Sequence, residues 1–242
     1  MTFEGKVTVV TGASTGVGLA VAKAFARSGS DVVLAARSAE DLGKAQADVE
    51  KLGGEALAVP TDISDREQCF ALIEQTMERF GRVDVLVNNA GIGLYKPVEN
   101  VLPEDLDKTL SVNFRGAMYC AQAAYNQMRE QGSGHIINVA SIAGKTGLPG
   151  ESAYNASKFA MVGFGQSLKK EAIHHGVRVD NVCPGGIDTP FWEKVPNPPD
   201  TSNFLTADDV AGLVAYVAST SERMVFDDIT VNPKNEFIER FA

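Results

Sequence analysis

The sequence predicts a single α/β domain: a doubly wound parallel sheet of about seven strands with helices on both faces. Short runs of β-branched and other apolar residues alternate with helical segments through most of the chain. Strands that are apolar throughout are typical of a parallel sheet buried on both faces, and the helices between them provide right-handed crossovers. A length of 242 residues suits one domain, so residues 1–242 are assigned to one unit.

In the first half of the chain, strands and helices alternate from the N-terminus. An opening β-branched run leads through a glycine-rich turn into a helical pattern that Gly29 closes. The next helix ends at Gly53 and Gly54, and Pro103 begins a long helix. We expect strands at 7–10, 32–36, 56–59 and 83–87, and helices at 17–27, 40–52, 65–80 and 104–129.

The second half repeats this alternation. A strand is expected at 135–140, a helix from 152 to about His174, a strand at 177–182 and a last strand at 229–231. In such a sheet, ligands bind beyond the carboxyl ends of the strands, where the strand order reverses. The motifs that carry chemistry map to that edge.

Composition and charge narrow the function classes. The net charge of −9 disfavours nucleic acid and anionic membrane surfaces as partners. No stretch approaches the ~20 apolar residues that cross a bilayer, and the N-terminus lacks a signal-peptide pattern. The cysteines Cys69, Cys120 and Cys183 and the three histidines show no metal-ligand spacing. We expect a cytoplasmic enzyme with reduced thiols and no metal.

Tyr154 and Lys158 are four residues apart at the start of the helix expected from 152. This spacing places a phenol and an ammonium on one helix face. A cation beside a phenol favours the phenolate and lowers the phenol pKa, so Tyr154 could exchange protons with a carbonyl or an alcohol. An isolated pair of this kind also occurs by chance on exposed helices, so its meaning depends on the other motifs.

A glycine-rich turn lies between the first strand and the first helix. Glycine lets the backbone approach a pyrophosphate closely, and the free amides of the helix N-terminus receive its charge. This placement favours a Rossmann-type dinucleotide site over a plain glycine turn, although the spacing departs from G-x-G-x-x-G. The candidate cofactor residues of the turn are Gly12, Ser14, Thr15, Gly16, Val17 and Gly18.

The end of the second strand indicates which dinucleotide binds. A carboxylate there would bind the ribose 2′-hydroxyl, but the chain has Arg37 and Ser38. A guanidinium and a hydroxyl suit a 2′-phosphate, so NADP(H) is favoured over NAD(H). NAD(H) remains the alternative if Arg37 faces solvent. Thr15 stands where a basic residue often supplements this role.

Together these motifs resemble the short-chain dehydrogenase/reductase family. They occur in the family's order from Thr11 to Thr189: the glycine turn, Asn88-Asn89-Ala90-Gly91, Asn113, Ser141, Tyr154 with Lys158, and Pro184-Gly185. The chain departs from a common pattern after its last strand, where Asn232 and Pro233 stand in place of aspartate-glycine-glycine. That departure puts the usual C-terminal subunit contacts in doubt.

The resemblance implies cofactor contacts along the sheet edge. Asp62 would hold the adenine amino group with Ile63 adding a backbone contact, although Asp62 also suits a cap of the turn that follows it. Asn88 would steady the sheet. The remaining expected contacts are Asn89, Ala90 and Gly91 at the cofactor ribose, and Pro184, Gly185, Ile187 and Thr189 at the nicotinamide.

The resemblance also implies the chemistry. Ser141 would orient a carbonyl and Tyr154 would donate the proton. Lys158 would lower the Tyr154 pKa and hold the nicotinamide ribose, and Asn113 would bind a water that relays protons. The expected activity is hydride transfer between NADP(H) and a carbonyl or secondary alcohol. The alternatives are an NAD-dependent alcohol dehydrogenase and a catalytically silent protein that senses dinucleotides.

The substrate pocket is expected to be mostly apolar. Its candidate residues are Leu94, Ala143, Leu148, Phe191 and Trp192. The segment of about 190–206 suits a short lid over the site or an ordinary surface loop. By resemblance, the helices at 104–129 and 152–174 would join subunits into a homodimer or homotetramer. A small carbonyl or alcohol is the expected partner.

Overall fold

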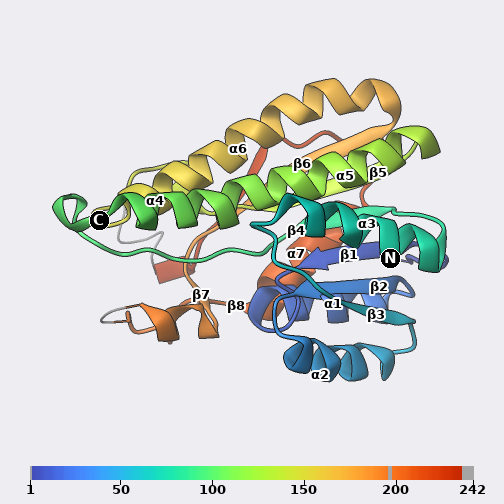
Figure 1. The fold of residues 1–242 in the computed structure, drawn as a ribbon, viewed down its shortest axis with the longest axis horizontal. Coiled ribbons are helices and arrows are strands. Elements are labelled where there is room, and N and C mark those ends of the chain that lie inside the picture. Colours follow the sequence, from blue (N-terminus) through green and yellow to red (C-terminus); the bar gives the residue numbers. More distant parts are fainter. Residues whose placement is uncertain (1, 196–197, 236–242) are drawn as a thin grey trace.

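The computed structural model describes residues 2–195 and 198–235 (Figure 1). Seven strands of this part form one parallel sheet in the order β3-β2-β1-β4-β5-β6-β9, which confirms the predicted fold class. The strands are β1 (Val7–Thr11), β2 (Asp31–Ala36), β3 (Ala56–Pro60), β4 (Val85–Asn88), β5 (Gly134–Val139), β6 (Val177–Pro184) and β9 (Asp228–Val231). The order reverses between β1 and β4, so a ligand crevice is expected at their carboxyl ends.

Helices cover both faces of the sheet (Figure 1). The helices are α1 (Gly16–Arg27), α2 (Ala39–Glu50), α3 (Arg66–Phe80), α4 (Pro103–Leu110), α5 (Gly116–Gln131), α6 (Ser152–Ala172) and α7 (Ala207–Ser219). Residues of α1, α2 and α7 share one hydrophobic cluster with the sheet, and residues of α3, α5 and α6 share a second on the opposite face. A hydrophobic core on each face of the sheet therefore supports the edge that carries the motifs.

The helix expected at 104–129 is present and runs from Pro103 to Gln131, but it contains a π-type turn that the sequence did not predict. Between α4 and α5 the chain makes a wider π-type turn, η2 (Ser111–Arg115). Such turns insert an extra residue into a helix and are frequent at functional sites. Here the turn carries Asn113, whose side chain is fully buried.

Two boundaries near the site also differ from the expected ones. Ser141 does not end β5 but lies two residues beyond it, where it caps the short 3-10 helix η3 (Ile142–Gly144). Strand β6 continues through Pro184 instead of stopping at Val182. The segment expected as a lid begins with η5 (Pro190–Lys194) and ends in β8 (Leu205–Thr206), which pairs with β7 (Ile187–Asp188); residues 196–197 lie outside the described residues.

A row of polar side chains crosses the carboxyl half of the sheet. Asn88 donates to Asn138 at 3.1 Å, Asn138 donates to Asn181 at 3.0 Å, and Asn181 donates to Asp228 at 2.9 Å. These residues share one register across β4, β5, β6 and β9. Lys145, in the loop after η3, binds Asp228 at 2.5 Å. Because buried amides are costly to leave unpaired, the row fixes the strand register next to Ser141.

All three cysteines are free and buried. In the described part of the chain, no helix combines the length and the apolar character needed to cross a bilayer.

A buried hydrogen bond ties β5 to β6 at the opposite end of the sheet. His135 lies 2.9 Å from the Asp180 carboxylate, and both side chains are almost fully buried. Lys169 and Arg178 lie 3.5 Å and 3.4 Å from the same carboxylate. Burial lowers the pKa of His135 below its ordinary value of 6.5, although Asp180 opposes this shift.

We therefore expect stability to fall in weak acid. A group whose folded pKa is depressed contributes stability above its unfolded pKa, and that stability is lost as pH falls below about 6.5, by at most about 1.4 kcal/mol per pH unit. Denaturant unfolding between pH 7 and pH 5 should show this loss in the native chain, and a smaller one in His135→Gln. The exposed His175→Gln is the control. If the unfolding free energy falls equally steeply with pH in His135→Gln and in the native chain, His135 is not the source of this loss.

Candidate active site

The glycine turn is packed against the loop that follows β4. Gly12 has φ +65°, and a Cβ at Gly18 would lie 2.2 Å from the Gly12 carbonyl oxygen. The Thr11 hydroxyl accepts hydrogen bonds from the backbone N–H groups of Asn89 and Ala90 at 3.0 Å and 3.1 Å. A larger residue at Gly18 would separate the turn from its helix. Two of the expected cofactor segments are thus locked together.

The N-terminus of α1 opens at this turn. Thr15 occupies the N-cap position but makes no side-chain cap hydrogen bond among the described residues. Gly16 has φ +54°, and a Cβ built there would lie 3.5 Å from the Thr189 side chain. Backbone N–H groups without a side-chain cap are what an anionic pyrophosphate requires. Ser14, Gly16 and Val17 are half-buried beside this helix end, so the residues present fit the diphosphate of a dinucleotide.

Arg37 and Ser38 follow β2, as expected, and both are exposed. The Ser38 hydroxyl accepts the N–H of Asp41 at 3.2 Å and caps α2. The first turn of α2 also carries Glu40 and Asp41. An anion at this helix end would therefore meet one guanidinium and two carboxylates.

Asp62 folds back on its own turn. Its carboxylate accepts hydrogen bonds from the Ser64 N–H at 2.9 Å and the Ser64 hydroxyl at 2.7 Å. These bonds lower the Asp62 pKa, and the charge of Arg37 adds to the shift. The structure thus shows the turn-forming role of Asp62. Ile63 is buried, and its carbonyl oxygen would lie 2.6 Å from a Cβ at Gly116.

The expected catalytic residues meet at the start of α6. Tyr154 and Lys158 lie on one helix face, and their side chains are nearly buried. The Lys158 Nζ lies 5.8 Å from the centroid of the Tyr154 ring and donates to the Val139 carbonyl at 3.3 Å. A Cβ at Gly91 would lie 3.7 Å from the same Nζ. The Ser141 hydroxyl lies near enough to the Tyr154 phenol to lower its pKa.

The expected direction of the Tyr154 pKa shift was wrong for this structure. Burial raises the pKa of Tyr154 well above that of a free phenol, and the nearby Ser141 hydroxyl only partly opposes it. Burial also lowers the pKa of Lys158 to about 8. Removing either group from water disfavours its charged form, and Lys158 does not contact the phenol oxygen closely enough to reverse this. Both shifts favour neutral side chains.

Asn113 is held on both sides of its amide. Its Oδ1 accepts the Ile92 N–H at 2.8 Å, and its Nδ2 donates to the Ile92 carbonyl at 2.9 Å. The same Nδ2 donates to the Ser157 hydroxyl at 3.0 Å. The Ser157 hydroxyl in turn donates to the Tyr154 carbonyl at 2.7 Å. Asn113 therefore links the loop after β4 to α6. Sequence reasoning missed Ser157, although it directly precedes Lys158.

Asn155 holds the loop between η3 and α6. Its amide nitrogen donates to the carbonyls of Ala143 and Thr146, both at 2.7 Å, and its oxygen accepts the Leu148 N–H at 3.2 Å. Two of the expected substrate residues, Ala143 and Leu148, are fixed in this way. The Ala143 N–H also donates to the Ser141 hydroxyl at 3.1 Å. Asn155 was missed because the spacing of Tyr154 and Lys158 does not reveal it.

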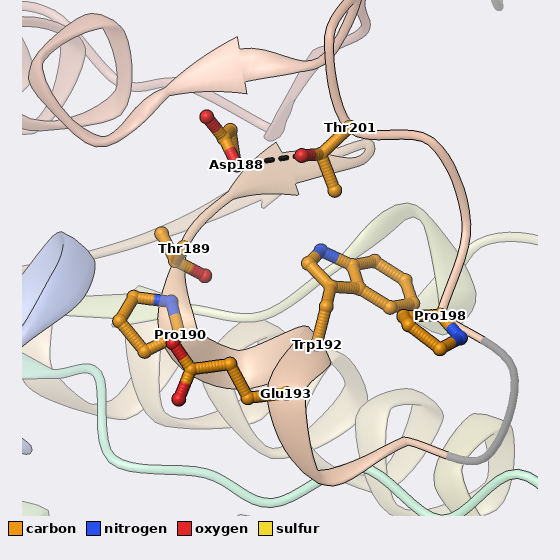
Figure 2. Close-up of a pocket in the computed structure, with 7 residues that line it drawn as sticks. All are labelled: Asp188, Thr189, Pro190, Trp192, Glu193, Pro198 and Thr201. Atoms are coloured by element: carbon orange, nitrogen blue, oxygen red, sulfur yellow. Dashed lines mark hydrogen bonds between the residues drawn. The ribbon is translucent and has the colours of Figure 1, made fainter.

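Beyond β6 the chain runs back to the site. The Gly185 N–H donates to the Val231 carbonyl at 2.8 Å, and the Ile187 carbonyl accepts the Trp192 indole N–H at 2.8 Å. An open pocket of about 410 Å³ is lined by Thr189, Trp192 and Glu193, among others. Figure 2 shows these residues around it. This part of the chain combines a residue expected at the nicotinamide with a residue expected at the substrate.

Aromatic rings surround Tyr154. The ring centroids of Tyr95 and Phe191 lie 6.1 Å and 6.2 Å from that of Tyr154, and Trp192 lies 5.5 Å from Tyr95. Leu94, the other expected substrate residue of this loop, is half-buried next to Tyr95. Tyr95 belongs to the segment 92–95, which the sequence predicts to line the substrate pocket.

Comparisons with known proteins agree with this geometry. The family model described as short chain dehydrogenase matches residues 6–200. An uncharacterized oxidoreductase from Thermotoga maritima is 42% identical over 187 residues, covering 76% of this chain and 73% of the relative. The 3-oxoacyl-[acyl-carrier-protein] reductase FabG from the same organism is 34% identical over 233 residues, covering 93% of this chain and 95% of the relative.

Solved structures show the same fold along nearly the whole chain. A levodione reductase superposes with a TM-score of 0.91 at 31% identity, covering 97% of this chain and 99% of that structure. A metagenomic short-chain oxidoreductase in complex with NADP superposes with a TM-score of 0.84 at 33% identity, covering 96% and 98%. The ordered motifs, their placement at one sheet edge and these matches establish that the chain belongs to the short-chain dehydrogenase/reductase family of oxidoreductases.

Proposed function

We propose that this protein is an NADP(H)-dependent reductase of ketones or aldehydes that also oxidises the corresponding alcohols. The observation that carries the proposal is the burial of Tyr154 and Lys158 on one face of α6, with the Lys158 Nζ 5.8 Å from the centroid of the Tyr154 ring. Ser141 lies near the same phenol. A protein that only senses a dinucleotide has no need of this proton-transfer group. The glycine turn beside it fits the diphosphate of the cofactor.

In reduction, Ser141 and Tyr154 would both hydrogen-bond the substrate carbonyl oxygen. Burial keeps Tyr154 protonated at neutral pH, so the phenol holds the proton that the product alcohol needs. When bound, the nicotinamide cofactor supplies the hydride. Lys158, with a pKa of about 8, is mostly charged at pH 7 and lies beside Gly91, where the ribose is expected.

The cofactor would lie along the carboxyl edge of β1, β4 and β6. Asp62 and Ile63 would face the adenine, and Lys158 and Thr189 the nicotinamide side. The further residues proposed to hold it are Gly12, Ser14, Thr15, Gly16, Val17, Gly18, Arg37, Ser38, Asn89, Ala90, Gly91, Pro184, Gly185 and Ile187.

One observation favours NAD(H) as the second candidate cofactor. Glu40 and Asp41 lie in the first turn of α2, next to Arg37, and their charges would repel a 2′-phosphate. Lys44 offsets part of this charge, since its Nζ lies 2.7 Å from Glu40 and 3.8 Å from Asp41. Both cofactors occur among the solved structures: an NAD+-bound xylitol dehydrogenase has a TM-score of 0.88 at 28% identity.

Tyr154→Phe tests the proton donor. The substitution removes the phenolic hydroxyl but keeps the ring, so NADPH binding should be unchanged while kcat falls by about 10²–10⁴-fold. Steady-state kinetics and fluorescence titration with NADPH measure the two quantities. The control is Tyr216→Phe, on the exposed face of α7. Turnover by Tyr154→Phe at the rate of the native enzyme would refute the assigned role.

Arg37→Asp tests the cofactor preference. Replacing the guanidinium with a carboxylate should shift the ratio of kcat/KM for NADPH over NADH by at least about tenfold toward NADH, since one charge-assisted bond to phosphate is lost and a repulsion is added. Arg223→Asp is the control for the change in net charge, because Arg223 is an exposed residue outside the proposed site. An unchanged ratio would show that Arg37 does not contact the cofactor.

Asn113→Ala separates a positioning role from a pure proton relay. The substitution leaves the Ile92 N–H and carbonyl without their partner, so unfolding free energy should fall by about 1–3 kcal/mol along with activity. Denaturant unfolding and steady-state kinetics measure both effects. Asn126→Ala, exposed on α5, is the control. Full stability combined with lost activity would favour the relay alone.

A further inference from the structure

The rings around Tyr154 have a consequence for the choice of substrate. Resting on the proposed function, we propose that the substrate is an uncharged ketone, or its alcohol, that carries an aromatic or six-membered alicyclic ring next to the reacting carbon. Tyr95, Phe191 and Trp192, here called the aromatic wall, would select that ring. Polyols and short open-chain ketones would be poor substrates.

The aromatic wall encloses the proton donor. Tyr95 and Tyr154 are near parallel, with an interplanar angle of 28° and centroids 6.1 Å apart. Phe191 stands edge-on to Tyr95 at 6.4 Å and tilted to Tyr154 at 6.2 Å. When Tyr154 donates its proton to a carbonyl oxygen, a group attached to the carbonyl carbon would therefore lie close to these rings.

The backbone is adapted to bring two rings of the wall together. Gly93 lies between them: a Cβ at this position would come within 2.6 Å of the Tyr95 ring and 2.7 Å of the Phe191 ring. Any larger residue at Gly93 would displace one of the two rings. The close approach of Tyr95 and Phe191 is thus a built feature of the loop after β4.

Trp192, the third ring of the wall, is fixed by a hydrogen bond and by ring packing. The Trp192 indole N–H donates to the Ile187 carbonyl at 2.8 Å, and the Phe204 ring packs against the indole with centroids 5.6 Å apart. Phe204 in turn sits on Gly186, where a Cβ would lie 2.8 Å from its ring. Trp192 also meets Phe191 edge-on at 5.5 Å. An anchored ring contributes apolar surface without the entropic cost of ordering it on binding.

The wall and the reacting end differ in chemistry. Ser141 and Tyr154 supply hydroxyl groups for one substrate oxygen, whereas the wall supplies ring faces and edges. A flat or alicyclic ring gains offset and edge-on contacts there. Each extra hydroxyl of a polyol would lose its hydrogen bonds to water beside these rings and would gain none from the ring surfaces. Unpaired polar groups in such sites reduce kcat/KM strongly.

Kinetics on matched substrates test the proposal. The unmodified enzyme, with whichever cofactor it accepts, is assayed on acetophenone, cyclohexanone, 2-butanone, acetoacetyl thioester and xylitol. We expect kcat/KM for the two ring ketones to exceed that for each of the other three by at least about tenfold. Equal or better turnover of 2-butanone, the thioester or xylitol would overturn the proposal. Absence of turnover with every substrate and both cofactors would instead overturn the proposed function.

Variants then assign the preference to the wall. Tyr95→Leu and Phe191→Leu keep apolar volume but remove a ring, and each should reduce the ratio of kcat/KM for acetophenone over 2-butanone by about fivefold or more. Tyr95→Phe keeps the ring and should keep the ratio. A ratio that stays constant in both leucine variants, or that falls equally in Tyr95→Phe, would contradict selection by the ring faces.

A binding measurement on the native chain does not depend on the folding of variants. Trp192 is the sole tryptophan of the sequence, so tryptophan fluorescence reports directly on the wall. With the reduced cofactor bound, so that the alcohol cannot be oxidised, 1-phenylethanol should change this fluorescence saturably at concentrations at least about tenfold lower than 2-butanol does. Equal midpoints for the two alcohols would overturn the proposal.

Discussion

The burial of two ionisable side chains on one helix face is the constraint on which the site depends. Tyr154 and Lys158 are almost wholly removed from water. Burial opposes the charged form of each, raising the pKa of Tyr154 and lowering that of Lys158 to about 8. Because neither group is solvated, the polar partners of the pair must come from the protein. The Val139 carbonyl and the Ser141 hydroxyl provide them, and both are positioned by β5.

The sheet edge is correspondingly well fixed. The row of amides from Asn88 to Asp228 sets the strand register beside Ser141, and Lys145 ties the following loop to the same row. Asn113 reaches inward from the π-type turn and joins the loop after β4 to α6. That loop carries both Gly91, expected at the cofactor, and Tyr95 of the aromatic wall. The loop proposed to contact the cofactor, the helix that carries Tyr154 and the aromatic wall are therefore parts of one connected structure.

The features that depend on local sequence pattern could be predicted from the sequence. Apolar strands, glycines that need positive φ and helix starts follow from neighbouring residues, and the seven-stranded sheet and the glycine turn were predicted from them. Features that depend on tertiary contacts were not predicted from the sequence. The contacts of Asn113 and the ring contacts of Tyr95 arise from segments far apart in the chain. The loop anchor Asn155 binds residues only 7 to 12 positions before it, but the fold of that loop is not visible in residue spacing. The helix 207–219 was not assigned, although Thr206 and Asp209 form a capping box at its start. Spacing alone also gave the wrong direction for the Tyr154 pKa, because burial is not visible in spacing.

The protonation state of Tyr154 tests the central claim most directly. The phenolate absorbance of the cofactor-free native chain, minus that of Tyr154→Phe, is measured while the pH is raised. Burial raises the Tyr154 pKa above the free value of 10.0, so the difference should show no phenolate until the pH exceeds that value. A difference signal with a midpoint at or below pH 9 would contradict the account, because it would show that Lys158, and not burial, controls the phenol before the cofactor binds.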